Sequence, residues 1–181
     1  MIGRILPFLI LVAPVLAEER VEVCYNWDCA AQTEVVFDDY QWLEVTRLIG
    51  LANNPAGERA LVAQSLGRLY QWAGEQTPIH NDRAGNRVDE DAEGRMDCID
   101  HSTTTTRFLK RLEASGALHW HRVLEPERRT RFIVVQHFAA VIEEQDNGER
   151  FAVDSWFVDN GQPAVVLPLA AWMEGEGPSV E

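Results

Sequence analysis

Three cysteines give this chain its main chemical potential, and one of them has no obvious partner. Cys24 and Cys29 stand close together in the segment CYNWDC, where a small disulfide loop can form. Cys98 is then left over. An unpaired cysteine is either a small buried apolar residue or a reactive thiol, and the residues around it decide between the two.

Cys98 stands where the sequence predicts a helix to begin. Asp97 can be the N-cap and Asp100 has the capping-box spacing, so we expect both carboxylates to cap the helix rather than face the sulfur. Backbone N–H groups and the helix dipole favour an anion at this end of a helix. The position therefore predicts a lowered pKa for the Cys98 thiol.

A base and an orienting carboxylate follow on two predicted strands. His137 lies in an apolar stretch, and Asp146-Asn147-Gly148 predicts a hairpin after it. If the hairpin closes near Asn147, His137 lies opposite Ser155 and close to Asp154. A nucleophile at a helix start, with a base and its orienter on adjacent strands, is the arrangement of a Cys-His-Asp triad.

Four segments carry a resemblance to a known family: FLKRLEASG at 108–116, HRV at 121–123, HFAAVIE at 137–143 and FAVDSW at 151–156. The order Cys, His, Asp and these segments resemble the transglutaminase-like domain of the papain-like cysteine peptidase superfamily, over about residues 90–160. The resemblance implies an α+β papain-like fold with the catalytic helix packed on an antiparallel sheet. It also implies acyl transfer on an amide of a protein or peptide through a thioester, by hydrolysis or transamidation, with Cys98, His137 and Asp154 as catalytic residues.

Oxyanion donors and competing interpretations remain open at this point. The backbone N–H of Cys98 and a side chain such as Gln76 or Trp72 are candidate oxyanion donors. The Asp97-Cys98 pair also fits the cell-wall peptidase branch of the superfamily, although that branch commonly has a second histidine in place of the aspartate and no histidine follows His137. A degenerate triad in a noncatalytic binding domain is a further alternative.

Two metal sites are also conceivable. Cys98 and His101 share a predicted helix face, and His119-Trp120-His121 adds two histidines on one side of a predicted strand, so these four could bind zinc. An acidic loop matches calcium-loop positions 1, 3, 5, 6, 9 and 12, with a solvated acidic loop as the alternative: Asp89, Asp91, Glu93, Gly94, Asp97 and Asp100. Apart from these two metal alternatives, we expect no cofactor.

Helices followed by strands must position these residues. Apolar spacing predicts helices over 33–50, from Pro55 onward, and over 97–115, with a long polar loop at 77–95. Strands are predicted over 119–124, 131–144 and 150–158, with a possible edge strand at 165–169 and a turn at Glu125-Pro126-Glu127. The threonines at 103–106 form helices poorly, so we expect their short side chains to let the helix lie close to a sheet. The pattern predicts an α+β domain.

The whole chain indicates an exported protein. Residues 1–17 have an early Arg4, a short apolar run and small residues before a cleavage site predicted between Ala17 and Glu18, as in a signal peptide. No cysteine follows that site, so we expect no lipid anchor. Residues 18–173 then form one domain, with a flexible tail at 174–181, in the periplasm or outside the cell. The net charge of −13 argues against nucleic acid or an anionic membrane as a partner and leaves the oligomeric state open.

Overall fold

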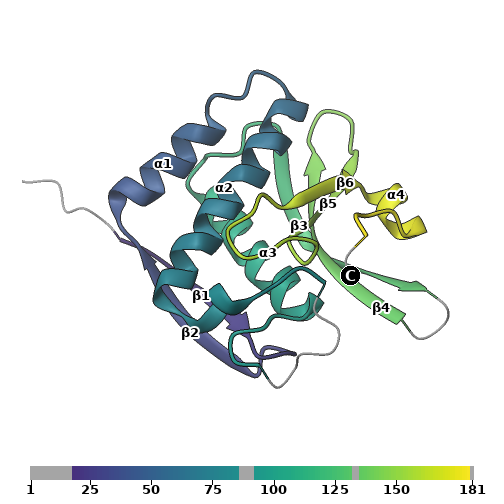
Figure 1. Cartoon of the computed structure of the whole chain (residues 1–181). Coiled ribbons are helices and arrows are strands. Elements are labelled where there is room, and N and C mark those ends of the chain that lie inside the picture. Colours follow the sequence, from purple (N-terminus) through teal and green to yellow (C-terminus); the bar gives the residue numbers. More distant parts are fainter. Residues whose placement is uncertain (1–17, 86–91, 132–134, 180–181) are drawn as a thin grey trace, which may run out of the picture.

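The fold is built around one helix, α3 (Cys98–Ala114), which packs on a two-stranded hairpin and on a four-stranded sheet (Figure 1). The computed structural model describes residues 18–85, 92–131 and 135–179. The predicted signal peptide, residues 1–17, lies outside the described residues. The mixed α+β class with an antiparallel sheet, predicted from the sequence, is confirmed.

The four-stranded sheet has the order β3-β4-β5-β6 and is antiparallel throughout. Its strands are β3 (His121–Arg131), β4 (Val135–Glu144), β5 (Arg150–Asp154) and β6 (Val165–Pro168). The predicted turn at Pro126 is wrong. The strand continues through it, and the pairing with β4 shifts between Leu124 and Glu127, because a bulge accommodates a residue that has no N–H to donate.

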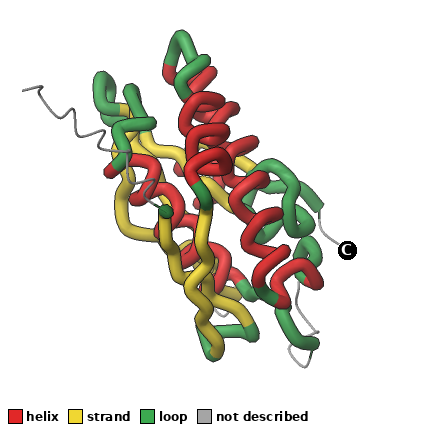
Figure 2. Tube along the Cα trace, turned by 90° about the vertical axis from the view of Figure 1, so that its left-hand side faces the viewer, coloured by secondary structure: helices red, strands yellow, loops and turns green. Residues whose placement is uncertain are grey.

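The hairpin of β1 (Glu19–Tyr25) and β2 (Ala31–Phe37) was not predicted. The expected helix over 33–50 begins only at Asp39, as α1 (Asp39–Ile49), because Asp38 caps it through a capping box with Gln41. Before that cap, alternate side chains of the hairpin are buried, among them Val21, Val23 and Val35. In a view turned by 90° from Figure 1, the hairpin strands (yellow) run alongside the helices (red) (Figure 2).

The remaining helices cover the core. α2 (Pro55–Gln76) begins at the predicted Pro55, with Asn54 as its N-cap, and is followed by the short 3-10 helix η1 (Pro78–Asn81) inside the predicted loop. The expected close approach at the threonine run is confirmed. Thr104 and Thr105 are fully buried, and Thr104 Oγ1 accepts a hydrogen bond of 2.9 Å from the backbone N–H of Cys24 in β1.

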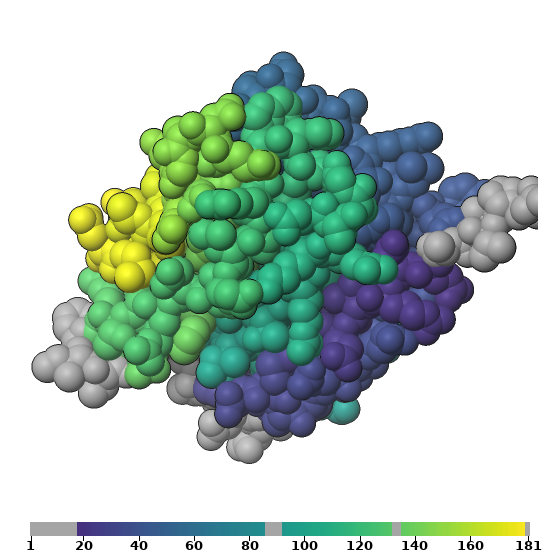
Figure 3. Space-filling model, turned by 180° about the vertical axis from the view of Figure 1, so that it is seen from behind, coloured from purple at the N-terminus to yellow at the C-terminus, as the bar shows by residue number. Residues whose placement is uncertain are grey.

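The chain returns to the sheet after β6. α4 (Leu169–Glu174) buries Trp172 completely, and Gly175 caps the helix in the left-handed conformation. Residues 175–179, which belong to the expected flexible tail, have defined contacts: the carbonyl of Glu176 accepts a 3.0 Å hydrogen bond from Arg129 Nη1. Space-filling spheres of this C-terminal segment (yellow) lie against the sheet (green) (Figure 3).

Candidate active site

Cys98 is the first residue of α3, and the predicted capping box is present. Asp97 Oδ1 accepts hydrogen bonds from the backbone N–H groups of Ile99 (2.9 Å) and Asp100 (2.8 Å). In return, Asp100 Oδ2 accepts a hydrogen bond of 3.2 Å from the backbone N–H of Asp97. Cys98 carries the only free thiol in the part of the chain that the structure describes. The helix start therefore presents a half-buried thiol beside two carboxylates.

The predicted lowering of the Cys98 pKa is wrong. Burial raises the pKa of the thiol to about 11, and the negative charges of Asp97 and Asp154 add to the increase. The backbone N–H groups of Phe138 in β4 and of Cys98 itself favour the thiolate, but they lower the pKa by less than burial and the two charges raise it. The resting cysteine is consequently a thiol at neutral pH, and it needs a base at the moment of attack.

His137 and Asp154 meet as the hairpin prediction required. His137 Nε2 lies 2.6 Å from Asp154 Oδ2, and both residues are buried. The register differs by one residue from the prediction, since Ala140 pairs with Val153 and the ladder ends there. Asp154 is the last residue of β5, so its carboxylate reaches His137 across the end of the ladder.

Asp154 is held by further donors, and His137 is enclosed by aromatic rings. The Trp172 indole N–H donates to Asp154 Oδ2 (2.8 Å), and the Trp156 backbone N–H donates to Oδ1 (3.2 Å). The His137 ring centroid lies 4.7 Å from that of Trp156, 5.6 Å from Phe157 and 5.7 Å from Trp172. These contacts fix the orientation of the imidazole and the tautomer with its proton on Nε2.

Cys98 and His137 line the same cavity, with a volume of about 650 Å³. Cationic, acidic and aromatic side chains surround it, and the C-terminal segment forms part of its wall. The other lining residues are Trp27, Asp97, Arg129, Arg131, Val135, Gln136, Trp156, Phe157, Gly175, Gly177, Pro178 and Ser179. The cavity is large enough for a peptide segment to reach the sulfur.

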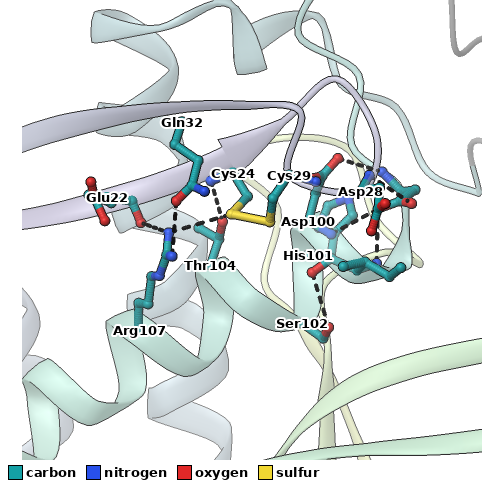
Figure 4. Close-up of a disulfide and its surroundings, with 12 residues drawn as sticks. Glu22, Cys24, Asp28, Cys29, Gln32, Asp100, His101, Ser102, Thr104 and Arg107 are labelled. Carbon is teal, nitrogen blue, oxygen red and sulfur yellow. Dashed lines mark hydrogen bonds between the residues drawn. A yellow bond between two sulfur atoms is a disulfide. The ribbon is translucent and has the colours of Figure 1, made fainter.

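The disulfide that the spacing of Cys24 and Cys29 allowed is present, and it anchors a loop beside the site. Cys24 and Cys29 are bonded, with their Cα atoms 4.7 Å apart. Figure 4 shows the disulfide against α3, where Arg107 Nη1 lies 3.4 Å from Cys24 Sγ and 3.1 Å from the carbonyl of Glu22. The β1–β2 connection is thereby fastened to the helix that begins with Cys98.

Residues 26–29 of this loop have an unusual backbone. Asn26, Trp27, Asp28 and Cys29 all have positive φ, between 52° and 64°. Such conformations are unfavourable for residues other than glycine and persist only where the surroundings hold them.

The two acidic residues beside Cys98 hold this loop. Asp100 accepts from the backbone N–H groups of Trp27 (2.8 Å) and Cys29 (2.7 Å), and Asp97 Oδ2 accepts from Asp28 (3.2 Å). The carboxylates flanking the cysteine thus cap the helix, as expected, and also bind the disulfide loop.

Trp27 is one of the site residues that the sequence did not predict. It lines the cavity, and its indole Nε1 is buried with no hydrogen-bond partner among the described residues. The signal that could have identified it is its place between the two cysteines of CYNWDC. The expected oxyanion donors Gln76 and Trp72 do not line the cavity: Gln76 is bonded to the backbone of Val36, and Trp72 packs against the main core.

The four candidate zinc ligands are not brought together. His101 Nε2 pairs with Asp82 Oδ2 at 3.0 Å, and Nδ1 lies 2.9 Å from Ser155 Oγ. Burial, the largest single effect, lowers the pKa of His101, but the charge and hydrogen bond of Asp82, with the charges of Asp154 and Asp100, together raise the pKa above its ordinary value. A raised pKa disfavours the neutral imidazole that a metal requires, and both ring nitrogens of His101 already have partners.

The other two histidines of that set lie elsewhere. His121 Nδ1 is 2.8 Å from the buried Glu58 Oε1, and His119 is exposed. Within the described ranges the group close enough to bind a metal is Cys24, Cys29 and Asp100, whose two sulfurs are consumed by the disulfide. Asp89 and Asp91 of the predicted calcium loop lie outside the described residues, so calcium binding stays a prediction.

Comparisons with known proteins do not identify a family. Among the described residues, no helix combines the length and the hydropathy needed to cross a bilayer. No family model, no curated protein and no solved structure matched the chain significantly.

Proposed function

We propose that the protein is an exported cysteine-dependent acyl-transfer enzyme that acts on an amide of a protein or peptide. The observation that carries the proposal is the buried His137–Asp154 pair, 2.6 Å apart, in the wall of the cavity that contains the free thiol of Cys98. A thiol and a histidine oriented by a carboxylate, in one cavity, are the groups that nucleophilic catalysis needs.

Each residue has a separate role in this reaction. His137 Nε2 is engaged by Asp154, which leaves Nδ1 to accept the thiol proton as Cys98 Sγ attacks the carbonyl carbon. The proton then passes to the leaving amine as the C–N bond breaks, and a thioester remains on Cys98. Water or an amine attacks the thioester, with His137 again as the base. General-base attack suits a thiol whose pKa of about 11 keeps it protonated at rest.

Trp27 and Cys98 supply the oxyanion donors in this proposal. Trp27 lines the cavity, and its buried indole N–H has no partner in the described structure, which is costly unless a ligand uses this donor. The backbone N–H of Cys98 lies at the start of α3, where the helix dipole also favours an oxyanion.

Acylation by p-nitrophenyl acetate tests the proposal without knowledge of the substrate. The full chain should release p-nitrophenol in a burst and carry one acetyl group on Cys98, detected by peptide mass spectrometry. Cys98→Ala should abolish the adduct, and His137→Ala should slow its formation about a hundredfold or more, as expected for loss of a general base. An adduct that forms equally fast without His137 would refute the proposed roles.

A noncatalytic binding domain is the second candidate, favoured by the raised pKa of Cys98. In that case the thiol is buried for packing, and His137 only fills the wall of a ligand pocket. Cys98 should then react slowly with iodoacetamide, at the same rate with and without His137.

A further inference from the structure

The C-terminal segment 175–179 occupies part of the cavity that contains Cys98. Gly175, Gly177, Pro178 and Ser179 line it together with Cys98 and His137. Residues 176–179 form no helix or strand, and all of them are exposed. A peptide of this chain itself is thus seated beside the candidate nucleophile.

Two arginines of β3 hold the segment through its main chain. Arg129 Nη1 donates to the carbonyl of Glu176 at 3.0 Å and also to the carbonyl of Trp172. Arg131 Nη1 lies 3.4 Å from the carbonyl of Gly175. Arg129 is buried, with its guanidinium carbon 4.6 Å from the centroid of the Trp172 ring, so this seat is rigid. Contacts to carbonyl groups bind a peptide backbone whatever its side chains are.

The side-chain selectivity of the seat comes from Phe157. A Cβ atom added at Gly177 would lie 3.0 Å from two ring carbons of Phe157 and closer still to a third. Phe157 is itself buried and packs on the His137 ring, at 5.6 Å between centroids, so it has little room to move. Only glycine fits at that point of the seat.

We propose that this part of the cavity is a binding site for a glycine-containing peptide, which residues 175–179 of the chain occupy in competition with an external peptide. Arg129 and Arg131 bind the peptide carbonyls, and Phe157 selects glycine at the position of Gly177. The inference rests on the proposed function, because it assigns the class of peptide that reaches Cys98.

Peptide binding to the full chain tests the site. The probe is the capped peptide Gly-Glu-Gly-Pro-Ser, with Gly-Glu-Val-Pro-Ser as its matched control, titrated into Cys98→Ala while tryptophan fluorescence or heat is measured. Adding Gly177→Val should displace the internal segment, because valine does not fit against Phe157. The glycine peptide should then bind about tenfold or more tightly than it binds the chain with Gly177 intact, or with Glu176→Val as the neighbouring control. The valine peptide should bind about ten- to two-hundredfold more weakly than the glycine peptide.

Equal binding of the two peptides, or equal affinity of the Gly177→Val and Glu176→Val chains, would overturn the inference. If Gly177→Val does not fold, the unsubstituted tail still permits the comparison, because discrimination between the peptides should persist at higher peptide concentration. The triad is tested separately by the His137 dependence of Cys98 alkylation without peptide. A failed peptide site and a failed triad therefore give different results.

Discussion

Asp100 makes the clearest pH prediction for a single residue. Burial raises the pKa of its carboxyl group to about 6, and the charge of Asp97 adds to the increase. Because the folded-state pKa exceeds the ordinary value of 3.8, the folded protein binds this proton more readily, and stability falls as the pH rises through about 6. The contribution of Asp100 amounts to about 1 kcal/mol between pH 5 and pH 7.

Asp100→Asn removes this titration and should reduce the stability gained between pH 7 and pH 5 by at least that amount. Urea unfolding at the two pH values measures it, with Asp146→Asn in the exposed hairpin turn as the control that keeps the wild-type difference. His101 also stabilises the fold below pH 6.5, and the charge of Asp100 is one of the causes that raise its pKa, so Asp100→Asn reduces the His101 contribution as well. If the free energy of unfolding changes between pH 5 and pH 7 by the same amount in Asp100→Asn as in the wild type, Asp100 does not titrate in this range.

Trp172 supports the proposed reaction through Asp154. Trp172→Phe keeps an aromatic ring beside His137 but removes the N–H that donates to Asp154 Oδ2. Loss of a hydrogen bond to a charged group is worth about 1.5–3 kcal/mol, so the acylation rate of Cys98 should fall about ten- to hundredfold. Trp120→Phe, whose ring packs on His119, is the matched control. Equal acylation rates in the two variants would contradict a positioning role for Trp172.

At the scale of elements, the disulfide loop joins the β1–β2 hairpin to the start of α3. Replacing Cys24 and Cys29 by serine should cost about 2 kcal/mol of stability, the value for closing so short a loop. The positive φ angles of residues 26–29 should then relax, and Trp27 should leave the cavity. We expect the acylation rate of Cys98 to fall at temperatures where the variant is still folded, as checked by circular dichroism. If the variant is less stable but acylates Cys98 at the full rate, Trp27 has no role in the reaction.

The elements that the sequence predicted are those with local signals. The capping box of Asp97 and Asp100 fixed the start of α3, and Asn147-Gly148 fixed the β4–β5 hairpin closely enough to pair His137 with Asp154. Strand β2 was missed because Phe37 at its end fits the helical spacing of the apolar residues that follow, and no strand was predicted over β1. The raised pKa of Cys98 depends on burial by distant elements, which no local pattern contains.

At the scale of the whole molecule, the candidate site assembles segments that are far apart in the sequence. Trp27, Arg129 and the segment 175–179 line one cavity with Cys98 and His137. The sequence could not predict this assembly, because Trp27 comes from the missed hairpin and residues 175–179 were expected to be flexible.

The proposal also has a consequence for the whole chain in the cell. If residues 1–17 are the signal peptide that we predict, the mature protein begins at Glu18 and contains the Cys24–Cys29 disulfide and one free thiol at Cys98. Intact mass spectrometry of protein from the periplasm or medium, before and after alkylation without reductant, measures all three features. An unprocessed chain that takes up three alkyl groups would contradict export.

The rate at which iodoacetamide alkylates Cys98, measured from pH 6 to pH 10 in the wild type and in His137→Ala, tests the central claim most directly. With the base in place, we predict ready alkylation at neutral pH. Without it, the rate should follow a thiol with a pKa of about 11, falling about a hundredfold or more at pH 7.5 and rising about tenfold per pH unit up to pH 10. Equal rates in the two proteins across this range would contradict a Cys98–His137–Asp154 triad.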